Sequence, residues 1–450
     1  MQKRKLSLVL EEGLAEVPLL DVHTHLDAAH LSARGLHDIL LYHMVISDLT
    51  SAGCPTPARL SDNPEEAEVE ARVTEALPYL QYIQNTSSFW ATRIILRDLY
   101  GWTEPISENN WRRLDKLVRE RAGDPAWPRE IMRRAGVQRA CTQLWHRRDG
   151  SADDILQYAL ERLFFVLFEW ESQNDHPLVD LESVWNVPDP YMPAPVLMGD
   201  DRPPITRRIL SLEDVHTAIR DYVSSVPRDL VVSTTQHLST DISYREVTDE
   251  EMAEALARRN QATRAERDVY GSYLFEAILV EFERQLPDMV HQFTMGAEPL
   301  PFETGSKMRQ ETIFELAAII ARHPRLHFQI FSSNEHTNQS LCTLARELPN
   351  LSLAGCWWHN FFPGVIRKVM TDRLDMLAAN KQIGFFSDAY CMEWCYAKAV
   401  LVRKQLAEVM AQKVEQGQYS VDESVSIARR ILFESPQSLV GIRPGGSGAT

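Results

Sequence analysis

Two histidines close to the N-terminus are the first residues of this chain whose types and spacing suggest chemistry. His23 and His25 stand two positions apart in the run Leu-Leu-Asp-Val-His-Thr-His-Leu, residues 19–26. In a β-strand, residues i and i+2 project from the same face, so the two imidazoles would lie side by side. Two adjacent imidazoles are half of a typical divalent-metal site. The alternative is a chance pair of solvated histidines, because a bare H-x-H is common.

Asp388 is the third candidate ligand. It follows the apolar run Gly-Phe-Phe-Ser, residues 384–387, at the end of the last strand that the pattern predicts. An unpaired buried carboxylate is costly, which favours a functional role, although an N-cap for the following helix is the alternative. The first and last strands of a closed barrel are neighbours. His23, His25 and Asp388 could therefore bind one divalent metal, with a position open for water or substrate.

Other polar and aromatic residues follow predicted strands. Tyr42 and His43 come soon after the first strand and could supply acid–base groups over the metal, although a surface histidine fits equally well. Trp357, Trp358 and His359 end a later strand. An indole beside a histidine at a barrel mouth suits sugar binding, whereas core packing is the alternative for the tryptophans.

The elements that must position these residues alternate between strand and helix. From Met289 onwards the predicted strands, each of which precedes a helix, are Val290–Met295, Leu326–Phe331, Leu351–Trp357 and Ile383–Ser387. Such alternation indicates βα units and a parallel sheet. About eight strand candidates in all favour a closed (β/α)₈ barrel over an open doubly wound sheet. No glycine-rich phosphate loop follows a strand, which argues against a Rossmann nucleotide-binding unit.

The domain organisation expected from these patterns is one barrel with an inserted helical segment. Residues 1–60 would begin the barrel and carry the first metal-binding strand, and residues 61–130 would form the insertion. Residues 131–441 would complete the barrel, and residues 442–450 would be a flexible tail. Within the barrel, Asp154–Trp170 is expected to be helical, and Ser420 with Glu423 predicts a capping box for the last helix.

Composition excludes several classes of function. The 450 residues carry a formal net charge of −16, which argues against nucleic acid and anionic membrane surfaces as partners. The six cysteines include no C-x-x-C pair, as expected in a reducing cytoplasm. We expect no signal peptide, because Glu11 and Glu12 interrupt the N-terminal apolar run, and no membrane span. The sequence leaves the oligomeric state open, a homo-oligomer included.

Several segments together resemble the uronate (glucuronate) isomerase family, a divergent branch of the amidohydrolase superfamily. Residues 21–26 resemble that family's D-x-H-x-H-L, residues 292–297 its Q-L-H-I-G-A, residues 355–360 its G-x-W-W-F-N and residues 386–390 its L-T-D-S-R. The resemblance implies a distorted (β/α)₈ TIM barrel with a helical insertion. It also implies one divalent metal, usually zinc, held by His23, His25 and Asp388.

Some residues depart from the family pattern. Tyr390 stands where the family has an arginine that holds the substrate carboxylate, and Thr294 stands where it has a histidine. The family's His-Tyr pair is inverted as Tyr42-His43, and its T-D-D motif is replaced by residues 142–144, Thr-Gln-Leu. The metal ligands are thus kept, while much of the substrate clamp is changed.

The combined expectation is an enzyme, a metal-dependent aldose–ketose isomerase acting on a uronate or related sugar acid. Asp388, His43 and Tyr42 would transfer protons, and the residues expected to contact substrate are Trp357, Trp358, His359, Tyr390 and Thr294. A metal-dependent hydrolase of lactones or amides is the first alternative. A non-catalytic sugar-acid binding protein is the second.

Overall fold

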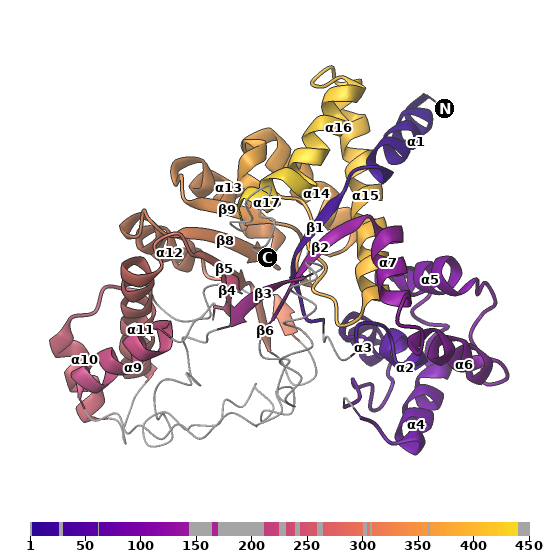
Figure 1. The fold of residues 1–450 in the computed structure, drawn as a ribbon, viewed down its shortest axis with the longest axis horizontal. Coiled ribbons are helices and arrows are strands. Elements are labelled where there is room, and N and C mark those ends of the chain that lie inside the picture. Colours follow the sequence, from indigo (N-terminus) through magenta and orange to yellow (C-terminus); the bar gives the residue numbers. More distant parts are fainter. Residues whose placement is uncertain are drawn as a thin grey trace, which may run out of the picture. The chain divides into compact units, whose positions relative to one another are not determined.

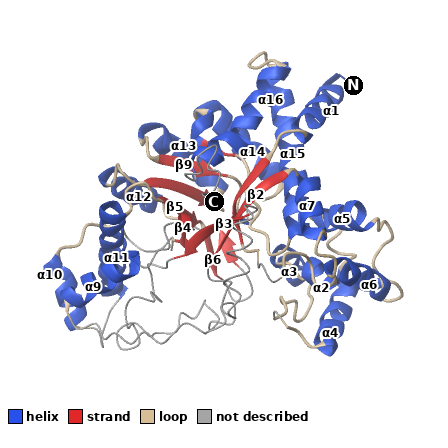
Figure 2. Ribbon diagram, viewed as in Figure 1, coloured by secondary structure: helices blue, strands red, loops and turns tan. Residues whose placement is uncertain are grey.

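In a computed structural model of the chain, the described residues are 2–26, 30–61, 63–143, 164–169, 211–224, 231–238, 244–258, 264–299, 304–306, 308–358 and 361–439. They belong to two compact units. Unit 1 comprises Met1–Phe164, Phe362–Met370 and Phe385–Phe433, and unit 2 comprises Phe165–Phe361, Thr371–Gly384 and Glu434–Thr450. Figure 1 labels the helices and strands along the chain, and Figure 2 distinguishes them by colour.

Unit 1 contains a pair of parallel strands and most of the N-terminal helices. Strand β1 (Leu19–Thr24) is buried throughout and pairs in parallel with β2 (Val137–Gln143). The register slips between Asp21 and Thr24, an irregularity of the kind that re-aims a side chain beside a functional site. The helices that surround them are α1 (Gln2–Ala15), α2 (Leu36–Leu40), α3 (His43–Ser51), α4 (Glu66–Ala76), η1 (Leu77–Tyr79), α5 (Ser87–Tyr100), α6 (Trp111–Ala122), α7 (Trp127–Ala135), α15 (Met392–Glu415), α16 (Val421–Arg429) and η7 (Arg430–Glu434).

The long helix α15 organises the packing of unit 1, because α1, α5, α7 and α16 all pack against it (Figure 1). Its apolar side chains are buried around most of its circumference, as expected of a core helix rather than a surface helix. Polar side chains on α15 are buried as well. The Arg403 guanidinium donates to the carbonyl oxygens of Ala135 at 2.5 Å and Val17 at 2.7 Å, which fixes the chain immediately before β2 and β1.

Unit 2 is a parallel sheet flanked by helices. Its strands run in the order β3 (Phe164–Glu169, of which Phe164 is assigned to unit 1), β4 (Val231–His237), β5 (Val290–Met295), β8 (His327–Ser332), β9 (Leu351–Ala354) and β10 (Gln382–Ile383). An antiparallel pair, β6 (Ala297–Pro299) and β7 (Thr304–Ser306), follows β5. The helices are α9 (Leu212–Ser224), α10 (Asp249–Ala257), α11 (Arg264–Gln285), α12 (Gln310–Arg322), η4 (Glu335–Thr337), α13 (Asn338–Glu347), η6 (Ala379–Lys381) and α17 (Ser435–Leu439). Helix α14 (Pro363–Met376) has residues in both units.

Most predicted elements are present, and the capping box of Ser420 and Glu423 is confirmed at the start of α16. One prediction is wrong: residues 164–169, expected to be helical, form strand β3. The apolar run Leu-Phe-Phe-Val-Leu-Phe, residues 163–168, is short enough that periodicity alone does not separate a buried strand from a buried helix. The predicted tail, residues 442–450, lies outside the described residues.

Two strands are shorter than predicted. Strand β9 ends at Ala354, because Gly355 and Trp358 have positive φ angles of 22° and 44°, which a strand does not accommodate. Strand β10 ends at Ile383 rather than Ser387. No helix in the described part of the chain is long and apolar enough to span a membrane.

Candidate metal centre

Three predicted ligands lie together in unit 1. His23 and His25 are contributed by β1 and the residue that follows it, and Asp388 comes from the segment 385–390 before α15. Oδ1 of Asp388 lies 3.0 Å from Nε2 of His25 and 3.7 Å from Nε2 of His23. One ligand atom from each of the three residues lies within 4.8 Å of the others. The side chains thus converge on one point, as the sequence predicted.

The donor set and its spacing fit a divalent metal. In a tetrahedral site with bonds of about 2.0–2.1 Å, ligand atoms lie about 3.3 Å apart, close to the separations from Asp388 to the two imidazoles. Two imidazoles and one carboxylate are a common set in catalytic zinc sites. Among the described residues, Oδ1 of Asp388 is buried and accepts no hydrogen bond of good geometry, although Nε2 of His25 is near. A buried carboxylate oxygen in this state is suited to a cation.

Backbone contacts with β1 bring Asp388 to the histidines. The Asp388 N–H donates to the carbonyl of His23 at 3.0 Å, and the His25 N–H donates to the carbonyl of Ala389 at 3.0 Å. Asp388 itself has a φ of 52°, in the left-handed region that few residues other than glycine, asparagine and aspartate adopt. These contacts explain why Asp388 does not belong to a β-strand. Its segment makes backbone hydrogen bonds to β1, but its left-handed backbone conformation interrupts a regular strand ladder.

Electrostatics keep Asp388 ionised. Burial alone would raise its pKa, but the adjacent imidazole of His25 and the positive charge of Lys398 outweigh burial, so the pKa lies below the ordinary range for aspartate. Lys398 is a buried side chain on α15. Burial lowers the pKa of Lys398 to about 8, opposed by the carboxylates of Asp388 and Asp21. An ionised Asp388 is the form that binds a metal or accepts a proton.

Asp21 accepts hydrogen bonds that stabilise the segment carrying Asp388. Its Oδ1 accepts the N–H of Ser387 at 2.8 Å, and its Oδ2 accepts the S–H of Cys395 at 3.3 Å. Burial raises the pKa of Asp21 to about 6, and the bonds from Ser387 partly oppose that rise. Asp21 therefore fastens β1 both to the segment that carries Asp388 and to α15.

Aromatic side chains form one wall of the site. The ring of Tyr390 stacks on the imidazole of His25, with centroids 4.9 Å apart and planes 13° apart. Tyr42 and His43 meet Tyr390 edge-on at 5.9 and 5.5 Å. The Tyr42 ring also stacks on Trp394 at 4.1 Å. The structure thus brings Tyr42, His43 and Tyr390 beside the three ligands.

The two predicted acid–base residues differ in their surroundings. The Tyr42 hydroxyl donates to the main-chain carbonyl of Asp388 at 2.9 Å, and burial together with the Asp388 charge raises the pKa of Tyr42. Burial and the charge of Lys398 lower the pKa of His43, which favours the neutral imidazole. Tyr42 is thus positioned to hold the backbone of Asp388, whereas burial favours the uncharged form of His43.

The remaining predicted substrate contacts lie in unit 2. Thr294 is buried in β5, Trp357 is buried after β9, and Trp358 meets Trp357 edge-on at 6.3 Å. His359 lies outside the described residues. A role for these residues in substrate binding remains a prediction.

Five arginines are relevant to how a substrate carboxylate could be held. Arg147 and Arg148 lie outside the described residues, and Arg245 and Arg309 form ion pairs with Glu251 and Glu315 in unit 2. Arg59, in the loop between α3 and α4 of unit 1, lies over the Tyr390 ring. No local sequence signal marks Arg59 or Lys398 for these positions.

Comparison with known proteins agrees with this fold. No protein-family model and no curated protein sequence matches the chain. Among solved structures, glucuronate isomerase from Caulobacter crescentus is similar at 15% identity and a TM-score of 0.78, covering 99% of this chain and 96% of that one. Uronate isomerase from Thermotoga maritima is similar at 13% identity and a TM-score of 0.75, covering 97% of each chain.

A third solved structure, a putative metal-dependent hydrolase from Lactobacillus casei, is similar at 14% identity and a TM-score of 0.60, covering 96% of this chain and 97% of that one. The chain therefore has the α/β fold of the uronate isomerase structures, and the fold class predicted from the sequence is confirmed. Within that fold it carries a buried His23–His25–Asp388 group that could hold a metal.

Proposed function

We propose that this protein is a metal-dependent aldose–ketose isomerase that acts on a uronate or a related sugar acid. The convergence of two imidazoles and one ionised carboxylate beside an aromatic wall is the observation that carries the proposal. The similarity in fold to uronate and glucuronate isomerases supports it. Zinc is the ion we expect, because the donor set is two nitrogens and one oxygen.

His23, His25 and Asp388 would hold the metal, and when bound it would supply a Lewis acid that polarises the substrate carbonyl. Isomerisation moves a proton from C2 of the aldose to C1, through an enediol. Asp388, which is ionised, and His43, whose neutral imidazole is favoured, are the groups that would accept and return protons. Tyr42 would keep Asp388 oriented through its bond to the main-chain carbonyl.

The aromatic wall bears on the choice of sugar. Tyr390 has one neutral hydroxyl in place of a charged guanidinium, which suits the hydroxyl groups of a sugar better than it suits a carboxylate. If Tyr390 alone binds the substrate carboxylate, we therefore expect weak turnover of D-glucuronate and D-galacturonate. Better activity is expected on a modified sugar acid, or on a sugar acid whose carboxylate is bound by an arginine elsewhere in the chain.

Solvent isotope exchange tests the reaction class directly. Zinc-loaded protein would be incubated in D₂O with hexuronates, other sugar acids and their neutral aldose analogues, and followed by NMR. An enediol route predicts ketose formation with deuterium entering at the carbon that receives the proton. The same assay with His23→Ala/His25→Ala protein is the control. Absence of both ketose and deuterium exchange across the panel would contradict the isomerase proposal.

A metal-dependent hydrolase is the second candidate, favoured by the similarity to the Lactobacillus casei protein. Such an enzyme would use the same ligands to activate water and would need no carboxylate clamp. Release of acid from sugar lactones or amides, without ketose formation, would support the hydrolase. A cytoplasmic location, a role in carbohydrate metabolism and assembly as a homo-oligomer belong to the isomerase proposal as further expectations.

A further inference from the structure

We propose that Arg59 binds the carboxylate of the sugar acid and that Tyr390 is the platform on which it does so. The inference rests on the proposed function and adds the residue that selects an acid over a neutral sugar. Arg59 is exposed and belongs to the loop between α3 and α4. Its guanidinium carbon lies 4.2 Å from the centre of the Tyr390 ring, a cation–π contact.

The Tyr390 ring links Arg59 to the candidate metal centre. Tyr390 lies nearly parallel to the His25 imidazole at 4.9 Å, so Arg59, Tyr390 and His25 are joined by two successive ring contacts. An arginine held over an aromatic ring keeps its in-plane N–H groups directed away from the ring, where they can donate to a carboxylate. The stack therefore holds a cation two ring contacts away from the candidate ligand His25.

The spacing suits a six-carbon sugar acid. Its carbonyl and carboxylate ends are separated by five single bonds, which span about 6 Å when extended. Two successive contacts, of 4.9 and 4.2 Å, place the Arg59 guanidinium at most about 9 Å from the His25 imidazole, a distance that the carbon chain covers once a hydrogen bond of about 2.9 Å to Arg59 is added. A sugar acid that lies along the edge of the Tyr390 ring can thus have one end at the candidate ligands while its carboxylate reaches Arg59.

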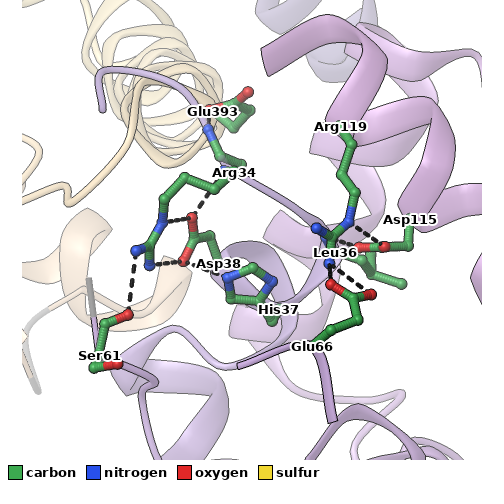
Figure 3. Close-up of polar contacts among 10 residues, drawn as sticks. Arg34, Leu36, His37, Asp38, Ser61, Glu66, Asp115, Arg119 and Glu393 are labelled. Atoms are coloured by element: carbon green, nitrogen blue, oxygen red, sulfur yellow. Dashed lines mark hydrogen bonds and ion pairs between the residues drawn. The ribbon is translucent and has the colours of Figure 1, made fainter. Parts of the chain in front are cut away.

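The loop that carries Arg59 is anchored by a polar network in unit 1 (Figure 3). The Arg34 guanidinium donates to the carbonyl of Ser61 at 3.1 Å, two residues after Arg59. Arg34 is itself fixed by Asp38, which accepts from Nε at 2.9 Å and from Nη2 at 2.7 Å. The adjacent His37 is buried, with its Nε2 3.4 Å from Asp38. Arg34 thus holds the loop that carries Arg59.

A small cavity lies next to this stack. Its volume is about 30 Å³, and its lining includes Arg34, Asp38, Arg59 and Tyr390, with the Asp38 carboxylate paired to Arg34. That volume admits a group of the order of one water molecule rather than a sugar ring. A terminal carboxylate oxygen, or a water bridging to it, is the size of group that fits beside Arg59. Because the chain has a net charge of −16, an anionic substrate needs a local positive charge at its binding site, and Arg59 supplies one.

The test compares an acid with its neutral analogue on zinc-loaded protein. Binding of D-glucuronate and of D-glucose, which differ at C6 alone, would be measured by calorimetry and by the KM for any turnover. Loss of a charge-assisted bidentate contact predicts that Arg59→Met weakens D-glucuronate binding about 10- to 100-fold. Binding of D-glucose should stay within about a factor of three. Arg59→Lys should recover part of the loss, because the charge is kept but the planar fork is not.

Substitutions at Tyr390 test whether its aromatic ring positions Arg59, and a substitution at Arg93 serves as a control. Tyr390→Leu removes the ring and should weaken D-glucuronate binding in the same direction as Arg59→Met, whereas Tyr390→Phe should retain it. Arg93→Met is the matched control: Arg93 is also exposed and lies 5.1 Å from the centre of an aromatic ring, that of Phe89 on α5. This control should change neither ligand's affinity.

The outcomes separate this inference from the proposed function. Equal binding of acid and neutral sugar by the wild type, or equal effects of Arg59→Met on both ligands, would overturn the role of Arg59. The isomerase proposal would survive either result if any aldose exchanges deuterium. If instead no sugar is isomerised but Arg59→Met selectively weakens acid binding, the inference holds and the catalytic proposal fails.

Discussion

Asp388 combines three structural roles in one residue. Its carboxylate faces two imidazoles, its N–H bonds to β1, and its carbonyl accepts the hydroxyl of Tyr42. The backbone φ of 52° costs about 1 kcal/mol for a residue with a side chain, less for aspartate or asparagine than for others. Surrounding contacts thus hold a strained residue in a fixed orientation, which is a common property of functional sites.

Replacing Asp388 with asparagine tests its charge while keeping its size and its tolerance for this backbone conformation. We expect activity to fall by at least ~10²–10⁴-fold even when metal is restored, since a general acid–base group alone is worth that much. Steady-state kinetics at matched zinc occupancy would measure it. Turnover close to that of the wild type would exclude both the ligand role and the proton-transfer role.

The ligand assignment also predicts the metal content. Elemental analysis of purified protein should give one divalent ion per chain, because the described residues contain one such cluster of ligands. His23→Ala/His25→Ala should abolish it, since two of three ligands are lost. His336→Ala, at an exposed histidine of unit 2, is the control. Two ions per chain, or full occupancy in the double variant, would contradict the assignment.

Among the elements, helix α15 connects the candidate centre to the helices of residues 66–135. Its first turn carries Glu393, which is completely buried. The Glu393 carboxylate accepts the N–H of Ala33 at 2.9 Å, the hydroxyl of Tyr100 at 2.7 Å and the indole N–H of Trp127 at 3.2 Å. Burial raises the pKa of Glu393, partly opposed by these donors. One carboxylate thus ties α5, α7 and the segment after β1 to α15.

Substituting Glu393 tests that connection. Glu393→Leu leaves three buried donors without their acceptor, and we expect the free energy of unfolding to fall by about 3 kcal/mol. Glu393→Gln keeps one oxygen as an acceptor and should lose about 1 kcal/mol. Urea unfolding followed by tryptophan fluorescence would compare the free energies of unfolding. Equal stability of both variants and the wild type would mean that the network contributes nothing net.

At the scale of the whole molecule, the fold and the convergence of the three candidate ligands were predictable from local sequence patterns. His23 and His25 share a strand face, and Asp388 follows an apolar run. Arg59 contacts Tyr390, and Lys398 interacts with Asp21, from distant parts of the chain, and a single sequence carries no periodic signal for such contacts. Strand β3 was mistaken for helix because its apolar run has no period at all.

Global stability should depend on pH through His323 in unit 2. This buried histidine lies between two carboxylates of α11, with Nε2 3.2 Å from Glu276 and Nδ1 3.1 Å from Glu283. Burial alone would lower the pKa of His323, but the two carboxylates outweigh it and raise the pKa. The folded state therefore binds this proton more tightly than the unfolded state, so the stabilisation is complete below about pH 6.5 and lost as pH rises through the folded pKa.

His323→Gln makes that dependence measurable. The difference in unfolding free energy between the wild type and this variant should be largest near pH 6 and should shrink as the pH rises. His336→Gln, at an exposed position, controls for the loss of a histidine. A difference that stays constant from about pH 6 to pH 9 would show that the charge of His323 does not contribute.

The candidate ligands come from opposite ends of the sequence. Asp21 and Ser387, which neighbour the ligands in sequence and are hydrogen-bonded to each other, are 366 positions apart. A bound ion would crosslink the chain across that interval, so ion uptake and folding are thermodynamically linked. Free ion at about 100 times its dissociation constant would add about 2.7 kcal/mol to stability. EDTA should therefore lower the melting temperature of the wild type but not that of His23→Ala/His25→Ala, which differential scanning calorimetry would measure. Cellular zinc supply would then set how much folded protein persists against proteolysis, whether or not substrate is present.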